Sequence, residues 1–348
     1  MPTHYASVAS RSSTGRILAR CQRRTRLSSY DSKTTAMSAN FGSPPLLFTR
    51  VCRHWRDVAH STPEIWSRIK VILPGRLVKP LTPFFPSLLQ VWLAQSGNLP
   101  LTICIYYIGF LPSSSHGVTV DSRLLEILYD ETRRWETVSA PSFIFRSNAS
   151  NMSQLRTLDR LWNLTDLIEF NAPNLCRACI VYSLSDTIRS FKPNAACRSI
   201  RHLSIDQALA SGIRRFPAIF PRLETLGVRI LTSYVSGMRS HSDTYSCLES
   251  MTLPFVDRPA DTFINIFRGL HLPALQNLTL LMGAGKPDVE MITEALAVAG
   301  SCHIRVLDFR WHESRSDIDP HTLEPLLSVV QEVAVHGEVV VCREQAGT

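Results

Sequence analysis

Cysteines and histidines are the residues of this chain best suited to metal chemistry. Cys176-x-x-Cys179, with Cys197 and His202 downstream, offers the thiol and imidazole ligands that zinc takes. Both cysteines, however, flank Ala178 within one predicted strand, and the second close pair of a structural zinc site is missing. A redox pair would instead stand at the start of a helix. We therefore expect free thiols and no metal.

Other catalytic patterns are incomplete. Gly283-Ala-Gly285-Lys286 lies between a predicted strand and a predicted helix, as a phosphate loop would, but Leu280 and Pro287 stand where glycine and a hydroxyl residue are needed. The chain has no Gly-x-Ser-x-Gly elbow and no His-Glu-x-x-His motif. A hydrolase with a spatial triad stays open as a hypothesis without a motif behind it. We expect a non-enzyme with no catalytic residues and no cofactor.

Charge is concentrated at the N-terminus. The 348 residues are 45% hydrophobic and 19% charged, with a formal net charge of +8. Residues 1–41 carry seven cations and one acid, so they supply +6 of that total. A nucleic-acid reader places its basic face on the folded domain, so we expect no nucleic-acid partner. The composition of residues 1–41 predicts a disordered tail, with a mitochondrial transit peptide as the alternative.

The cellular compartment follows from the cysteines and the apolar runs. Nine scattered cysteines cannot all pair, and residues 1–20 lack the apolar core of a secretory signal. The longest apolar stretch, residues 99–111, is interrupted and too short to span a bilayer. We expect a reducing compartment, cytosol or nucleus, and no membrane association.

Helical spacing dominates residues 44–134. Apolar residues recur every three to four positions from Pro44 to Ala59, and Ser61-Thr-Pro-Glu64 then begins a second, short helix. The predicted core of these helices is Val51, Trp55, Val58, Ile65 and Trp66. Further predicted elements are a strand at 69–73, a helix from 82 to 97, a strand at 101–107 and a helix at 121–134.

From residue 135 the sequence is repetitive. Apolar residues at positions one, four and six of a unit recur at intervals of 23 to 29 residues, the range of leucine-rich repeats. Proline precedes position one by two residues in three units. Positions four and six would point inward from a short strand, with successive strands stacked in parallel. The units are Leu175-Ala178-Ile180, Ile200-Leu203-Ile205, Leu223-Leu226-Val228, Leu248-Met251-Leu253, Leu275-Leu278-Leu280 and Ile304-Leu307-Phe309, preceded by the weaker Trp135-Val138 and Leu155-Leu158-Leu161.

The remaining positions of each unit predict an outer layer and an exposed face. Residues 261–270 and 288–298 have helical apolar faces, and a helix at 323–335 with a strand at 339–341 would close the array. Alternation turns positions three, five and seven outward, and their mixed polar character suits a protein partner. The predicted substrate-binding residues are Arg177, His202, Ser204, Asp206, Thr225, Arg229, Asn277, Thr279, Asp308 and Arg310.

The segment from Val51 to Trp66, Val-Cys-Arg-His-Trp-Arg-Asp-Val-Ala-His-Ser-Thr-Pro-Glu-Ile-Trp, closely resembles the second half of an F-box. Its Ser-Thr-Pro-x-Ile-Trp phrase is similar to the F-box proteins of mushroom-forming fungi, in which irregular leucine-rich repeats follow. The resemblance implies an α/β fold, with a short helical F-box segment before a repeat solenoid that has a curved parallel sheet and outer helices. The expected divisions are a tail at 1–41, a partial F-box at 42–73, capping elements at 74–134 and repeats at 135–348.

The resemblance also implies a function. Residues 44–66 would bind a Skp-type adaptor through Leu46, Leu47 and Phe48, and the repeats of a monomer would hold a protein substrate for a ubiquitin ligase. Two departures qualify this expectation: residues 1–41 lack the opening Leu-Pro-x-Glu helix, and position nine of the repeats lacks asparagine or cysteine. We therefore expect weak adaptor binding. The alternative is a leucine-rich-repeat scaffold without ligase association.

Overall fold

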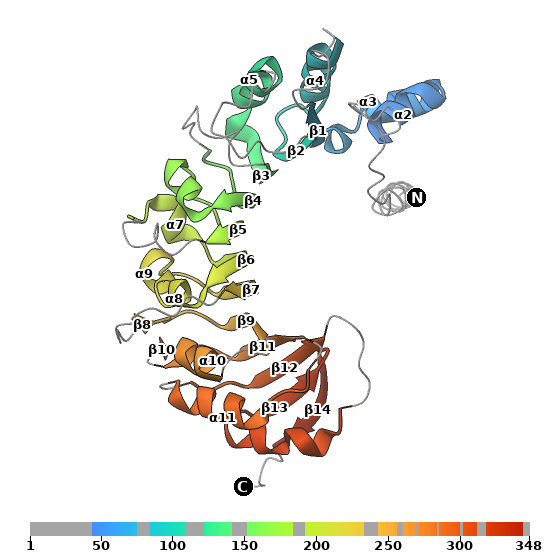
Figure 1. Cartoon of the computed structure of the whole chain (residues 1–348). Helices are drawn as coiled ribbons and strands as arrows, with labels where there is room; N and C mark the ends of the chain where they lie inside the picture. The colour runs from blue at the N-terminus through green and yellow to red at the C-terminus, as the bar shows by residue number, and fades with distance from the viewer. Residues whose placement is uncertain are drawn as a thin grey trace, which may run out of the picture. The chain divides into compact units, whose positions relative to one another are not determined.

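The chain has an α/β fold with two compact units, residues 1–128 and 129–348 (Figure 1). This computed structural model describes residues 44–74, 84–108, 122–140, 152–183, 192–232, 243–255, 260–268, 270–283, 285–299, 302–311 and 318–343. The predicted tail, residues 1–41, lies outside them. Within these ranges no helix is long and apolar enough to cross a membrane.

The first unit combines short helices with two strands. Its elements are α2 (Pro44–Val51), α3 (Arg53–His60), η2 (Pro63–Ile65), β1 (Arg68–Pro74), α4 (Phe84–Gln95), β2 (Leu101–Ile108) and most of α5 (Ser122–Asp130). β1 and β2 pair in parallel, with Ile69 opposite Ile103. The strand pair therefore joins the predicted F-box segment to the predicted capping elements within one unit.

The helix predicted from residue 44 to residue 59 is broken at Cys52. That residue is extended, with φ −159° and ψ 174°, and separates α2 from α3. Arg56 on α3 donates from Nε to the carbonyl of Thr49 on α2, at 2.9 Å. This contact satisfies a carbonyl in the last turn of α2, which a continuous helix would have bonded internally.

The second unit is built on one row of parallel strands. In spatial order they are β3 (Trp135–Ser139), β4 (Thr157–Asn163), β5 (Arg177–Ser183), β6 (His202–Leu209), β7 (Thr225–Thr232), β9 (Ser250–Phe255), β11 (Asn277–Met282), β12 (Val306–Trp311), β13 (Glu332–Val335) and β14 (Glu338–Cys342). Neighbours pair in parallel except β13 and β14, which pair antiparallel. A separate two-stranded sheet joins β8 (Asp243–Thr244) to β10 (Leu270–His271).

The strand register confirms the predicted inward positions. Position four forms a continuous row from Ala178 through Leu203, Leu226, Met251 and Leu278 to Leu307. Every residue of this row is at most 2% exposed, and positions one and six are equally enclosed. The core of the unit is therefore the apolar row that the triplets predict.

The recurring prolines stand at the second position of a repeated turn. The amide of Leu175 donates to the carbonyl of Ala172 at 3.1 Å, and the pairs Leu223–Phe220 and Leu275–Leu272 repeat this bond at 3.2 Å. Pro173, Pro221 and Pro273 hold the φ angle that this position requires. The turn thus delivers each strand into the sheet in the same way.

Short helices cover one side of this row (Figure 1). They are η5 (Leu164–Glu169), α7 (Ala195–Ser199), α8 (Ala210–Ile213), α9 (Phe216–Ile219), α10 (Ala260–Phe267), α11 (Val289–Val298) and η6 (Pro320–Ser328). Asn194 caps α7, because its side chain accepts a hydrogen bond from the amide of Cys197. Its Nδ2 also donates to the carbonyls of Leu167 and Phe170 in the preceding repeat. One asparagine on the helical side thereby links two repeats.

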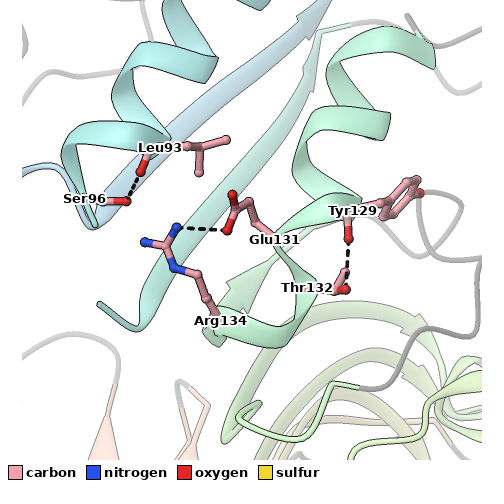
Figure 2. A network of polar contacts seen from close by, with 6 residues as sticks. All are labelled: Leu93, Ser96, Tyr129, Glu131, Thr132 and Arg134. Carbon is pink, nitrogen blue, oxygen red and sulfur yellow. Dashed lines mark hydrogen bonds and ion pairs between the residues drawn. The ribbon is translucent and has the colours of Figure 1, made fainter. Parts of the chain in front are cut away.

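Side chains also satisfy polar groups near helix ends. Figure 2 shows Ser96, fully buried, donating to the carbonyl of Leu93 at the end of α4. After α5, Thr132 donates to the carbonyl of Tyr129, and Arg134 in η3 (Thr132–Arg134) pairs with Glu131 at 2.9 Å. These contacts bond groups that the helices leave unsatisfied, so we assign them to folding.

The closing segment differs from its prediction. Residues 332–335, expected to end a helix, form strand β13 beside β12. Val333 continues the inward row beside Leu307, and Ala334, beside Asp308, is buried on the opposite face of the strand. Because an apolar run this short fits a strand or a helix equally well, the periodicity could not separate the two.

Candidate protein-binding surface

The ten predicted substrate-binding residues lie on one face of the sheet in the second unit. Arg177, His202 and Thr225 are aligned across β5, β6 and β7, and Thr279 is aligned with Asp308 across β11 and β12. Because inward and outward positions alternate along a strand, residues in register share a face. The same register places Asp206 opposite Arg229, and it aligns Arg310 with Leu281.

The accessibility of these residues varies. Arg177, Ser204, Arg229, Asn277 and Arg310 are exposed. His202, Asp206, Thr225 and Thr279 are half-buried. His202 Nδ1 lies 3.0 Å from Thr225 Oγ1, so these two side chains form a hydrogen bond across neighbouring strands. The face is a set of short polar side chains with an arginine at intervals.

Asp308 is an exception, because it is only 6% exposed. Its carboxylate accepts from the amide of Gly337 at 2.9 Å and from Arg310 Nε at 2.6 Å. Gly337 belongs to the turn between β13 and β14 and has a φ of +87°, a conformation that suits glycine. Asp308 therefore holds this turn in place, and its assignment to the substrate surface is corrected to a structural one.

Asp159 lies beside Cys179, a contact that the sequence did not predict. β4 contains a bulge, with Leu158 opposite Ala178 but Leu161 opposite Ile180, and Arg160 within it has a φ of +65°. Burial raises the pKa of the Cys179 thiol, and the adjacent carboxylate of Asp159 raises it further. The longer spacing of the Leu155-Leu158-Leu161 triplet was the available signal for this bulge.

Cys179 is free, as are Cys176 and Cys197. In the described ranges no three His, Cys, Asp or Glu side chains gather as metal ligands would. The zinc pattern in the sequence therefore has no matching cluster among these residues.

A row of charged residues at position two of the repeats was also not predicted from the sequence. Glu136 faces Arg156 at 3.9 Å, Arg201 pairs with Glu224 at 2.9 Å, and Arg305 lies 3.7 Å from Glu332. Glu332, the acid of the last pair, lies at position three of its repeat instead of position two. Each pair joins two neighbouring strands near their starts. The charged residues directly after position one were the sequence signal for this row.

The F-box-like segment has one anchoring side chain. Trp66 is 2% exposed, and its indole Nε1 donates to the carbonyl of Ala59 at 2.7 Å. The indole of Trp92 on α4 donates in turn to the carbonyl of Trp66 at 2.8 Å, with the two rings edge to face. The predicted core role of Trp66 is thus confirmed, whereas Trp55, Val58 and Ile65 are only half-buried.

The predicted adaptor residues differ among themselves. Leu47 is 46% exposed, whereas Leu46 is half-buried and Phe48 stacks on Trp55 with ring centroids 5.3 Å apart. Val51, predicted as core, is 59% exposed, because α2 ends at this residue and the continuous apolar stripe ends with it. The apolar side chains that α2 offers to a partner are therefore Leu47 and Val51.

A comparison with protein-family models finds no match to this chain, and a comparison with curated proteins finds none either.

Proposed function

We propose that this chain is a protein-recognition module of the F-box and leucine-rich-repeat kind, acting in the cytosol or nucleus. The sheet face of the second unit holds a protein substrate, and residues 44–66 bind a Skp-type adaptor of a ubiquitin ligase. The observation that carries the proposal is the in-register polar face over a fully apolar inner row. A repeated face of this kind offers many small polar contacts to one partner.

The adaptor half of the proposal rests on α2. Leu47 and Val51 are exposed large apolar residues on a short helix whose sequence resembles an F-box. An apolar helix face laid against a partner groove is a common mode of recognition. Phe48 packs within the unit, so it contributes to binding only by holding α2 in place.

The alternative is a repeat scaffold with no adaptor, favoured by the missing Leu-Pro-x-Glu pattern. Titration calorimetry with a purified Skp-type adaptor separates the two. We expect wild-type binding near or weaker than about micromolar. Leu47→Asp and Val51→Asp should each weaken it by roughly tenfold, because a carboxylate replaces a buried apolar contact.

Val91→Asp is the matched control, because Val91 is 52% exposed on α4. It should leave the affinity unchanged. Absence of any wild-type binding would refute the adaptor role and leave the scaffold. Equal losses in all three variants would show that the contact is not on α2.

A further inference from the structure

The second unit contains two stretches of opposite charge. Residues 152–232 contain 11 lysines and arginines against 6 acids, a net charge of +5. Residues 233–348 contain 8 against 15, a net charge of −7. The overall charge conceals this division, because the two stretches largely cancel.

Arginines gather at the turns and starts of strands β4 to β7. The amides of Cys176 and Arg177 donate to the carbonyl of Arg156, and the amide of Arg201 donates to the carbonyl of Cys176. The three arginines thus stand on three neighbouring strands, about 10 Å apart from first to last. Arg198 and Arg222 lie in the segments that lead into β6 and β7. We call Arg156, Arg177, Arg198, Arg201 and Arg222 the arginine edge.

A pocket lies beside two members of this edge, Arg198 and Arg222. It has a volume of about 550 Å³, and its lining includes Pro173 and Pro221 of the repeated turns, together with Asn194, Arg198 and Arg222. Among the residues that the structure describes, two cations and no acid line it. Such a hollow is suited to an anionic side chain, because a guanidinium binds a carboxylate through two parallel hydrogen bonds.

The cations of the edge are available to a partner. Arg177, Arg198 and Arg222 are exposed and form no ion pair with any residue that the structure describes. Arg156 lies 3.9 Å from Glu136, with 72% of its side chain exposed. Arg201 is held by Glu224. Exposed ion pairs of this kind contribute little to stability, so a partner carboxylate can replace them.

We propose that the arginine edge binds an acidic segment of a partner protein. This inference rests on the proposed function and names the chemistry of the substrate it recognises. A protein fits better than a nucleic acid, because the cations span only a few strands before the net negative stretch begins. A long polyanion would be repelled there, whereas a short run of glutamates would not.

The test is fluorescence anisotropy of the full chain with a labelled octaglutamate peptide. An octaglutamine peptide is the neutral control. We expect the wild type to bind octaglutamate alone, and to release it as the Debye length falls from about 10 Å at 0.1 M salt to about 3 Å at 1 M. Arg177→Glu combined with Arg222→Glu should reduce affinity by roughly tenfold or more, since each charge-assisted bond contributes on the order of that factor.

Arg305→Glu is the matched control, at position two of a distant repeat. It should bind octaglutamate as the wild type does. If the double variant melts earlier than the wild type, Arg177→Gln and Arg222→Gln replace it with the same expected direction. A phosphoserine-rich peptide that binds through the same arginines would support the site and identify phosphate as a second source of the anion.

Three results would overturn the inference. They are no binding of octaglutamate, equal loss in Arg305→Glu, and tighter arginine-dependent binding of a single-stranded oligonucleotide than of octaglutamate. None of these bears on the adaptor titration, or on substrate capture by the remaining polar positions of the sheet face, which charge exchange at Asp206 and Arg229 would test. Failure here can therefore be told apart from failure of the proposed function.

Discussion

The indole of Trp66 connects three parts of the first unit. The ring centroids of Trp66 and His60 are 6.0 Å apart, and the indole Nε1 of Trp66 donates to the carbonyl of Ala59. The backbone carbonyl of Trp66 accepts a hydrogen bond from the indole of Trp92. Trp55 is half-buried and contacts mainly Phe48 and His54 among the aromatic rings. The two tryptophans therefore contribute unequally to stability, although the sequence pattern gave them the same role.

Trp66→Ala should lower the free energy of unfolding by about 3 to 5 kcal/mol, the usual cost of removing a buried indole. Trp55→Ala should cost about half as much, because less of its ring leaves water on folding. Trp66→Phe removes the hydrogen bond to Ala59 together with part of the buried ring, so its cost should lie between about 1 kcal/mol and that of the alanine variant. Denaturant unfolding monitored by circular dichroism measures all three. Equal losses for both alanine variants would contradict the burial difference.

The cysteines form two groups by environment. Burial raises the pKa of Cys197 and of Cys302 to about 11. A higher thiol pKa leaves less thiolate at neutral pH, and the thiolate is the reactive form. Iodoacetamide at pH 8 should therefore modify the exposed Cys52, Cys247 and Cys342 well before Cys197 and Cys302. Peptide mass spectrometry over time gives the order, and early modification of Cys197 would show that its helix opens.

At the scale of elements, Asp308 and the turn between β13 and β14 depend on one another. Asp308→Asn should lower the free energy of unfolding by about 1 to 3 kcal/mol, because charged bonds to Gly337 and Arg310 are weakened in a buried place. Arg310→Glu should also destabilise, since it brings a second carboxylate to within reach of Asp308. Thermal melting measures both changes. Arg229→Glu is the control: Arg229 is exposed and forms no ion pair with any residue in the described ranges, so this variant should melt as the wild type does.

Most strands of the second unit could be predicted from the sequence, because the same apolar pattern recurs in each repeat. The apolar triplets determine which face of each strand is buried, and the turn prolines mark where strands begin. The break at Cys52 could not be predicted, because the contact between Arg56 and Thr49 across it forms only in the folded chain. Nor could the bulge at Arg160, since one extra residue resembles ordinary variation in repeat length.

The position of the polar sheet face could be predicted from the sequence, but the environment of each side chain on it could not. Alternation alone placed the ten residues on one face of the sheet. It could not show that Asp308 is enclosed, because the residue that encloses it, Gly337, comes from a later turn. The arginine edge could not be predicted for a related reason, because its members occupy different positions within different repeats. Only the stacking of turns beside strand starts brings them together.

At the scale of the molecule, the proposed function divides recognition between two surfaces of different chemistry. The α2 helix offers apolar side chains, and the sheet face with its arginine edge offers polar and charged ones. Apolar contacts favour a constant partner, whereas charged contacts favour selectivity among partners and faster encounter. Such a division suits an adaptor that keeps one machinery and selects its substrate.

The central claim is that the sheet face selects the substrate, and the pair formed by Asp206 and Arg229 offers its most direct test. These residues stand at the same position of neighbouring strands, so Asp206→Arg with Arg229→Asp leaves the net charge of the face unchanged while exchanging the two charges that a partner meets. Melting temperature should hardly change. Quantitative capture of a substrate identified with the wild type, alongside the Skp-type adaptor, is the measurement. We expect the exchanged variant to lose the substrate and keep the adaptor, and Glu294→Lys on the helical side to keep both. Substrate capture that survives the exchange, or that Glu294→Lys abolishes equally, would contradict the claim.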